Sequence, residues 1–363
     1  SASRFLAKPS AMQSPRSGCE SKPKFVRSHG VGPPIAQLGR QLTSRVPTTY
    51  IPRVKRPATS DLVDRLINQG SISPANRPFM DVFSLPRRQI VENILALARK
   101  IVFPGIFDEY RVNNANLKYH IGMLTSELKQ VIEDQVTRAT LYSWKDTSPK
   151  ATEECARRAQ KISAEFLESL PLLRSILADD VDASLRGDPA AKSAEEIILC
   201  YPGVEAIFIH RVAHELHRLG VPLLPRMMSS YGQYRTAIDI HPGAKIGKAI
   251  FMDHGSGLVI GETTEIGKNV KLFHGVTLGA LSYQDGQAMA GVKRHPTIED
   301  DVTIYAGAVI LGGDTVIGAG ATVGGSLCVT NSVPPGHMAY QPPLEVFSKP
   351  MKPKNTTARK EES

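Results

Sequence analysis

The stretch Ile298-Glu-Asp-Asp-Val-Thr-Ile304-Tyr-Ala-Gly-Ala-Val-Ile310 places a branched aliphatic residue at every sixth position. A period of six matches neither the 3.6-residue turn of an α-helix nor the two-residue alternation of a hairpin strand. It is typical of a parallel β-helix, in which each hexad is one short strand plus a turn and the leading aliphatic residues stack into an interior column. The alternative is a set of short strands in an ordinary β-sandwich.

The same period extends in both directions from this stretch. Its leading positions are Ile240, Ile246, Ile260, Ile266, Leu272, Leu278, Ile298, Ile304, Ile310, Ile317, Val323 and Val329. We therefore predict a left-handed β-helix of hexapeptide repeats over residues 236–340. The six-residue spacing is interrupted twice, because Ile260 follows Ile246 by fourteen residues and Ile298 follows Leu278 by twenty. We expect loops to be extruded at both breaks, and loops on a rigid scaffold commonly carry function.

Residues 61–235 have a helical pattern instead. Apolar residues recur three and four apart, as in Leu117, Ile121, Leu124, Leu128 and Ile132, which predicts amphipathic helices packed as a bundle. The fold class is therefore α+β, with a helical domain followed by the β-helix. We expect helices to begin or end at the prolines of this region. These are Pro104, Pro149, Pro171, Pro189, Pro202 and Pro222.

The charge of the chain is unevenly distributed. Residues 1–60 hold eleven basic side chains and one acidic one, so this segment has a net charge of +10. The whole chain has a net charge of +9, so residues 61–363 are close to neutral at −1. Basicity confined to a tail argues against a nucleic-acid-binding fold. The composition of residues 1–60 is that of a disordered basic arm or an organellar transit peptide. Residues 341–363 form a C-terminal tail.

The cysteines and the hydropathy of the sequence exclude several further classes of protein. The four cysteines are scattered without a C-x-x-C pair, which fits neither a disulfide framework nor a zinc knuckle and predicts reduced thiols. No apolar run reaches the ~18 residues that a membrane span needs. We expect a protein that neither spans a membrane nor binds nucleic acid.

Several motifs resemble serine O-acetyltransferase, the hexapeptide-repeat enzyme of cysteine biosynthesis. They are Asp239-Ile-His-Pro-Gly-Ala-Lys-Ile-Gly, Asp253-His-Gly-Ser-Gly-Leu-Val-Ile-Gly-Glu-Thr, Gly275-Val-Thr-Leu-Gly and Lys293-Arg-His-Pro. The resemblance is dense over residues 180–340 and reaches back to about residue 80 only in outline. It implies transfer of an acetyl group from acetyl-CoA to the hydroxyl of L-serine.

That reaction needs a base, because the hydroxyl of serine is a poor nucleophile at neutral pH. A histidine oriented by a carboxylate meets this need. The resemblance implies His254 as the general base and Asp239 as the orienting carboxylate.

Free serine also carries an ammonium and a carboxylate. The resemblance implies that Asp188 and Asp253 bind the ammonium, while Arg294 and His295 bind the carboxylate, since the planar guanidinium suits a carboxylate. The acetyl-CoA groove is implied to follow positions where small residues let the backbone approach the ligand, with Lys293 as a phosphate contact. These positions are Gly279, Ala280, Ala306, Gly324 and Gly325.

A histidine cluster outside these motifs invites a metal-site interpretation. His210, His214 and His217 share one helical face, but they lack the flanking carboxylates and the H-E-x-x-H order of a zinc site. We expect no metal. Two other functions stay open: a hexapeptide acyltransferase acting on a sugar hydroxyl, and a γ-carbonic-anhydrase-like β-helix using His254, His274 and His295.

The resemblance also implies partners. It predicts a homotrimer or a dimer of trimers with active sites between subunits, and L-cysteine as a feedback inhibitor. Members of the family dock a terminal isoleucine into O-acetylserine sulfhydrylase, whereas this sequence ends in Glu-Glu-Ser363, so that partner is not expected. We expect a cytoplasmic location, or an organellar matrix of the mitochondrion or plastid if residues 1–60 act as a transit peptide.

Overall fold

The computed structural model describes residues 59–68, 85–282, 286–342 and 348–349. The basic segment 1–58 and most of the predicted C-terminal tail lie outside the described residues. Helix α1 (Thr59–Asn68) belongs to a first unit, residues 1–77. All other described elements belong to a second unit, residues 78–363.

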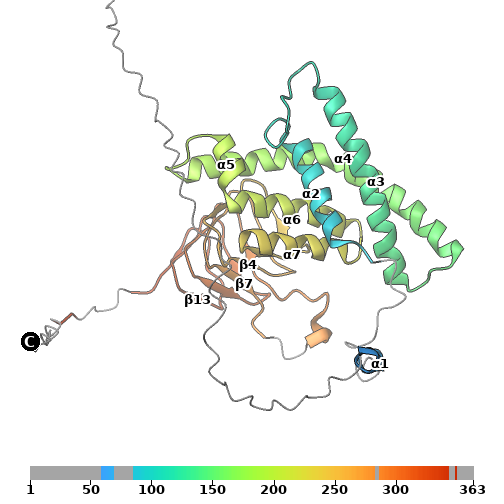
Figure 1. Cartoon of the computed structure of the whole chain (residues 1–363). Coiled ribbons are helices and arrows are strands. Elements are labelled where there is room, and N and C mark those ends of the chain that lie inside the picture. Colours follow the sequence, from blue (N-terminus) through green and yellow to red (C-terminus); the bar gives the residue numbers. More distant parts are fainter. Residues whose placement is uncertain (1–58, 69–84, 283–285, 343–347, 350–363) are drawn as a thin grey trace, which may run out of the picture. The chain divides into compact units, whose positions relative to one another are not determined.

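The second unit begins with six helices. They are α2 (Arg88–Val102), α3 (Leu117–Trp144), α4 (Pro149–Gly187), α5 (Ala194–Cys200), α6 (Pro202–Arg218) and α7 (Leu224–Thr236). The predicted apolar stripe of α3 is buried through Leu124, Leu128 and Ile132. Helices α6 and α7 run side by side next to the strands (Figure 1). The predicted amphipathic helices are therefore present.

The prolines behave as expected with one exception. Pro149 and Pro202 are the first residues of α4 and α6, where the missing N–H costs nothing. Pro171 lies inside α4, so the prediction of a helix boundary there was wrong. Burial of Phe166, Leu170 and Leu173 on both sides of the proline explains why the helix continues despite the lost hydrogen bond.

Fourteen short strands follow within the described residues. They are β1 (Asp239–Ile240), β2 (Lys245–Ile246), β3 (Phe251–Asp253), β4 (Val259–Ile260), β5 (Glu265–Ile266), β6 (Lys271–Phe273), β7 (Thr277–Gly279), β8 (Thr297–Ile298), β9 (Thr303–Ile304), β10 (Val309–Leu311), β11 (Val316–Ile317), β12 (Thr322–Val323), β13 (Cys328–Val329) and β14 (Met338–Ala339). They form three parallel sheets, ordered β1-β4-β7-β10-β13, β2-β5-β8-β11 and β3-β6-β9-β12-β14. This is the predicted left-handed parallel β-helix.

The leading aliphatic residues stack in register as the six-residue period predicted. In the first sheet Ile240 pairs with Ile260, Ile260 with Leu278, and Leu278 with Ile310. Met252 heads a similar column by pairing with Leu272. The expected fourteen-residue break before Ile260 therefore contains one further hexad, led by a methionine rather than a branched residue.

Helices and β-helix share one hydrophobic core. A side chain at Gly187, the last residue of α4, would place its Cβ 2.5 Å from the ring of Phe251 in β3, so glycine is required for this approach. No helix of the described residues has both the length and the apolar character that crossing a bilayer requires.

A buried ion pair fixes the orientation of the helices on the first coil. Asp180 of α4 accepts from Arg211 of α6 at 2.7 and 3.0 Å, and Arg211 also donates to the carbonyls of Ile246 and Gly247. Asp180 further accepts from the N–H of Ile250 at 3.0 Å. This cluster joins α4, α6 and the β2–β3 turn just before Asp253.

Candidate active site

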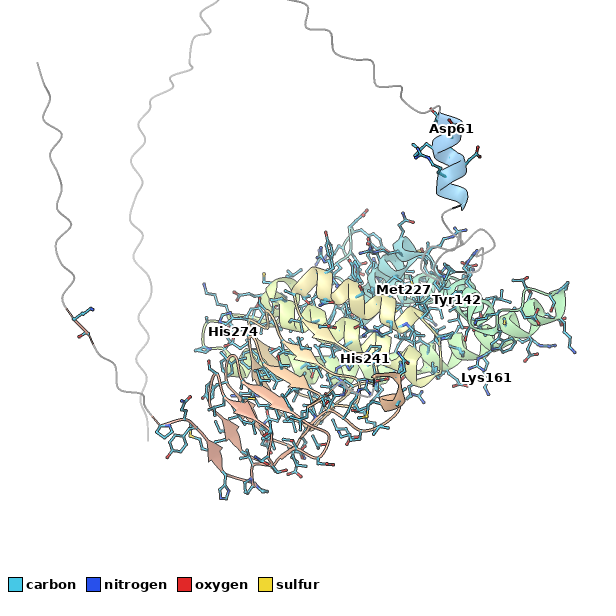
Figure 2. All side chains as sticks on the ribbon, turned by 90° about the horizontal axis from the view of Figure 1, so that it is seen from below. Asp61, Tyr142, Lys161, Met227, His241 and His274 are labelled. Atoms are coloured by element: carbon cyan, nitrogen blue, oxygen red, sulfur yellow. The ribbon has the colours of Figure 1, made fainter. Side chains whose placement is uncertain are left out.

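The predicted site residues gather at two corners of the β-helix. The His254 corner, where the third sheet turns into the first, comprises residues 254–258, 274–276, 305–308 and 324–327. The His295 corner, where the first sheet turns into the second, comprises the described residues 241–244, 261–264, 280–282, 286–296 and 312–315. The labels His274 and His241 in Figure 2 mark the two corners.

His254 is one of two residues inserted into its corner. The N–H of Gly275 donates to the carbonyl of Ser256, and the N–H of Gly307 donates in the same way to the carbonyl of His274. Ser256 therefore occupies the same position in its turn of the β-helix as His274 does in the next turn. His254 and Gly255 are extra residues in the repeat. His254 adopts a φ of 56°, a left-handed conformation that is uncommon outside glycine. Its side chain is 76% exposed, 3.7 Å from the carboxylate of Asp253. The imidazole is therefore presented to solvent at the edge of the coil.

Asp188 reaches the same corner from the helical region. As the C-cap of α4 it ends the helix that packs on β3. The hydroxyl of Tyr201 donates to its Oδ2 at 2.5 Å, and the N–H of Ala190 donates to Oδ1 at 2.8 Å. The packing of α4 on β3 thus brings Asp188 within electrostatic reach of His254.

The charges at this corner are coupled. The Tyr201 hydrogen bond, followed by the Ala190 N–H and the nearby His254, holds the pKa of Asp188 below its usual value. The same hydrogen bond raises the pKa of Tyr201 to about 12. Asp188 is consequently anionic and Tyr201 is a neutral donor, an arrangement suited to binding an ammonium group.

The His295 corner is organised by Thr263. Its hydroxyl accepts from the backbone N–H of Arg294 at 2.9 Å and of His295 at 3.1 Å. Its carbonyl accepts from the ammonium of Lys293 at 2.7 Å. The guanidinium of Arg294 forms an ion pair with Glu262. One threonine thus fixes residues 293–295, directly before β8.

His295 is neutral, whereas a cationic contact to a carboxylate would need a protonated imidazole. Burial lowers the pKa of His295 to about 4, and its Nδ1 accepts from the N–H of Thr263 at 3.1 Å. The neutral ring therefore carries its proton on Nε2. A Cβ at Gly261 would lie 2.0 Å from this ring, so glycine is needed beneath it.

Within one chain the predicted site is split between the corners. Asp188, Asp253 and His254 lie at the His254 corner, whereas Arg294 and His295 lie at the His295 corner. Asp239 lies on β1, and in the described part of the chain it forms no hydrogen bond or ion pair with His254.

The predicted acetyl-CoA positions are divided in the same way. Ala306, Gly324 and Gly325 follow His254 along its corner in successive coils, and Gly325 is close enough that a Cβ would lie 3.0 Å from the carbonyl of Ala306. Gly279 ends β7 and Ala280 opens the extruded loop, at the His295 corner with Lys293. Burial lowers the pKa of Lys293.

The histidine face of α6 packs against the β-helix. His210 is buried, and His214 lies 2.8 Å by its Nδ1 from the carbonyl of Pro242. The ring of His217 lies 6.2 Å from that of His241. Among the described residues, no group of three or more histidine, cysteine, aspartate or glutamate side chains is placed to hold a metal ion.

Sequence reasoning missed Tyr201, Thr263 and Glu262 as parts of these corners. Tyr201 follows a short helix and carries no motif of its own, so only the tertiary contact with Asp188 reveals it. Glu262 and Thr263 stand inside the quoted motif after Asp253. Their position directly before the second-sheet strand could have marked them.

Comparison with known proteins places these features in a family. No protein-family model matches the chain. A plasmid-encoded serine acetyltransferase of Synechococcus elongatus is 39% identical over 295 residues, covering 79% of this chain and 92% of the relative. The serine acetyltransferase of Bacillus licheniformis is 49% identical over 159 residues, covering 44% of this chain and 70% of the relative.

Solved structures agree with the sequence relatives. Serine acetyltransferase 1 of Entamoeba histolytica in complex with L-cysteine superposes with a TM-score of 0.60 at 35% identity, over 69% of this chain and 86% of that one. The native form of that enzyme gives a TM-score of 0.59 at 31% identity, over 78% and 100% of the two chains. The chain described here belongs to the serine acetyltransferase family.

Proposed function

We propose that this enzyme transfers the acetyl group of acetyl-CoA to the hydroxyl of L-serine, with His254 as the general base. The observation that carries the proposal is the meeting of His254, Asp253 and Asp188 at one corner of a β-helix whose relatives are serine acetyltransferases. The product, O-acetyl-L-serine, would feed cysteine biosynthesis.

The chemistry assigns one proton transfer to His254. The serine oxygen attacks the thioester carbonyl, so a C–O bond forms while the C–S bond breaks. His254 takes the hydroxyl proton and returns it to the departing sulfur of CoA. The exposure of its side chain leaves room for both substrates. We propose Asp239 as its orienting carboxylate, contributed in the assembled enzyme.

Binding of serine would join the two corners. Asp188 and Asp253 would hold the ammonium, and Arg294 with the neutral His295 would hold the carboxylate. Because one chain carries these groups at different corners, we propose that the site forms between neighbouring subunits of a homotrimer, alone or as a dimer of trimers. Glu262, which pairs with Arg294 here, would share that guanidinium with the substrate.

Acetyl-CoA would lie along the groove between neighbouring subunits. Ala306, Gly324 and Gly325 continue the His254 corner beyond the base and leave space for the pantetheine arm, while Gly279 and Ala280 line the facing corner. Lys293 would contact a phosphate. The proposal needs no metal.

L-cysteine is proposed as a feedback inhibitor of the same site. The Entamoeba histolytica relative was solved in complex with L-cysteine, and cysteine carries the same ammonium and carboxylate as serine. Inhibition should therefore be competitive with serine, and a cysteine titration of the serine-dependent rate measures it directly.

The assay that tests the function is release of CoA thiol from acetyl-CoA with and without L-serine. We expect a serine-dependent rate, and we expect His254→Ala to lower kcat by about 10²–10⁴-fold. His337→Ala, an exposed histidine far along the solenoid, is the matched control and should keep wild-type kcat. An absence of serine-dependent thiol would reject the assignment.

Substrate competition separates the alternatives. Acetylation of a sugar hydroxyl at a rate equal to that of serine would show that Asp188 and Arg294 do not form an amino-acid clamp. Stoichiometric zinc in the purified protein would instead favour a γ-carbonic-anhydrase-like site.

We also propose that residues 1–60 direct the protein to an organelle. Their removal should then change its location without changing kcat.

A further inference from the structure

A cavity of about 290 Å³ lies among α2, α5, α6 and α7. It is lined by Arg99, Phe103, Phe107, Ile198, Leu199, Cys200, Tyr201, Pro202, Val204, Glu205, Phe208 and Arg235. None of these residues belongs to the proposed serine or acetyl-CoA contacts. The volume is at the lower end of small-molecule sites, which run from roughly 300 Å³ upward.

The charges of the cavity favour an anion. The guanidinium groups of Arg99 and Arg235 both approach Oε1 of Glu205, at 3.0 and 3.4 Å. These three are the charged residues of the lining, so one positive charge is left over. Arg99 and Glu205 are largely shielded, with side chains 23% and 21% exposed. A carboxylate could bind the surplus guanidinium edge through paired hydrogen bonds.

The walls of the cavity favour an apolar body attached to that anion. Phe103 lies 6.4 Å from the rings of both Phe107 and Phe208. The guanidinium of Arg99 sits over Phe107 and Phe208, at 5.1 and 5.2 Å from the ring centroids. The cation is thereby held against an aromatic surface with room for a ring or a branched chain.

One wall residue connects the cavity to the serine site. Tyr201 lines the cavity and donates its hydroxyl hydrogen to Asp188 at 2.5 Å. Pro202, its neighbour, is the first residue of α6. A ligand packed on this wall would favour the arrangement in which Tyr201 holds Asp188.

We propose that this cavity binds a small organic carboxylate with an aromatic or branched aliphatic body, and that its binding strengthens serine binding through Tyr201. The binding site stands on the cavity alone, while the coupling rests on the proposed function of Asp188.

The binding step is tested on the full chain with 3-phenylpropionate as the probe, by isothermal titration calorimetry. We expect saturable binding that weakens about tenfold or more for the neutral 3-phenylpropanol and for Arg99→Met. A lack of saturable binding, or equal affinity for the alcohol, overturns the proposal.

Cysteine alkylation gives a second readout that needs no variant. Cys200 lines the cavity and is exposed, and Cys328 is exposed on β13. The probe should slow iodoacetamide modification of Cys200 and leave the rate at Cys328 unchanged, as measured by peptide mass spectrometry. Equal rates at Cys200 with and without the probe would contradict binding in this cavity.

The coupling is tested by measuring serine affinity with the probe and probe affinity with serine. Linkage requires both to tighten by the same factor, and Tyr201→Phe should abolish that factor while keeping probe affinity. Probe affinity unchanged by serine overturns the coupling, and weaker serine binding would place the probe in the serine site. If serine does not bind at all, the proposed function fails while the calorimetry still decides the cavity.

Discussion

At the scale of single residues, the hydrogen bond from Tyr201 to Asp188 makes a direct kinetic prediction. Tyr201→Phe removes the donor that orients the carboxylate and lowers its pKa. We expect KM for serine to rise by about three- to tenfold, because a solvent-accessible hydrogen bond to a charged group is worth less than a buried one. Turnover at saturating serine should change little.

The control for that substitution is Tyr234→Phe, on an α7 tyrosine that is 79% exposed. It should leave both KM and kcat unchanged. A Tyr201→Phe enzyme with wild-type KM for serine would show that Asp188 does not need the tyrosine to bind substrate.

His295 predicts a pH dependence of stability. Its folded-state pKa of about 4 is below the ordinary value for histidine, so the unfolded chain binds more protons between about pH 6.5 and pH 4. The free energy of unfolding should therefore fall as the pH drops through that window. His295→Gln should reduce the slope in this window without removing it, because burial also lowers the pKa of His241 to about 4. Urea denaturation at fixed protein concentration measures the slope.

The comparison for the His295 experiment is His337→Gln, at an exposed turn of the last coil. We expect this variant to keep the wild-type slope. If His295→Gln also keeps that slope, the imidazole is not held neutral by burial.

These residue-level features differ in how far they could be predicted. Asp188, Asp253 and His254 stand in recognisable motifs, so their roles could be proposed from the sequence. The neutral state of His295 could not, because it depends on Gly261 and Thr263 meeting the ring across 32 residues of chain. Tyr201 was equally hidden, since its partner Asp188 lies 13 residues away, at the end of α4.

At the scale of elements, the buried ion pair of Asp180 and Arg211 predicts a stability cost. Arg211→Met leaves the carboxyl group of Asp180 buried without its charged partner, which should destabilise the fold by about 3–5 kcal/mol. The double variant Asp180→Leu with Arg211→Met should recover most of that loss, because it removes both buried charges. Chemical denaturation of the single and double variants measures the difference.

A double variant as unstable as Arg211→Met would contradict this account of the ion pair. Its stability would then depend on the contacts of Arg211 with the carbonyls of Ile246 and Gly247. The surface pair Lys245–Glu265 is a suitable control, since both side chains are exposed. Its removal should cost less than about 1 kcal/mol.

The secondary-structure elements could be predicted where the sequence repeats, because each repeat folds into the same local structure. Each hexad of the β-helix has the same pattern, so a single periodicity predicted the parallel β-helix. The hexad of Met252 was missed because an unbranched side chain fills the same interior slot. Pro171 misled the helix prediction, since packing on both sides outweighs a local propensity. The docking of α4 on β3 depends on contacts that no period contains.

At the scale of the whole molecule, the division of the site between two corners is the central structural fact. One chain holds the proposed base and ammonium contacts at the His254 corner and the carboxylate contacts at the His295 corner. Symmetric assembly would bring the His254 corner of one subunit to the His295 corner of its neighbour. Each corner alone lacks part of the proposed serine contacts.

Mixing two inactive variants tests this account most directly. His254→Ala and Arg294→Ala chains, denatured together in equal amounts and refolded, should regain about one quarter of the wild-type serine-dependent rate, since that share of random interfaces joins two intact halves. Each variant refolded alone stays at its own low rate. If the mixed sample is no more active than the two variants separately, the two corners are not halves of one site.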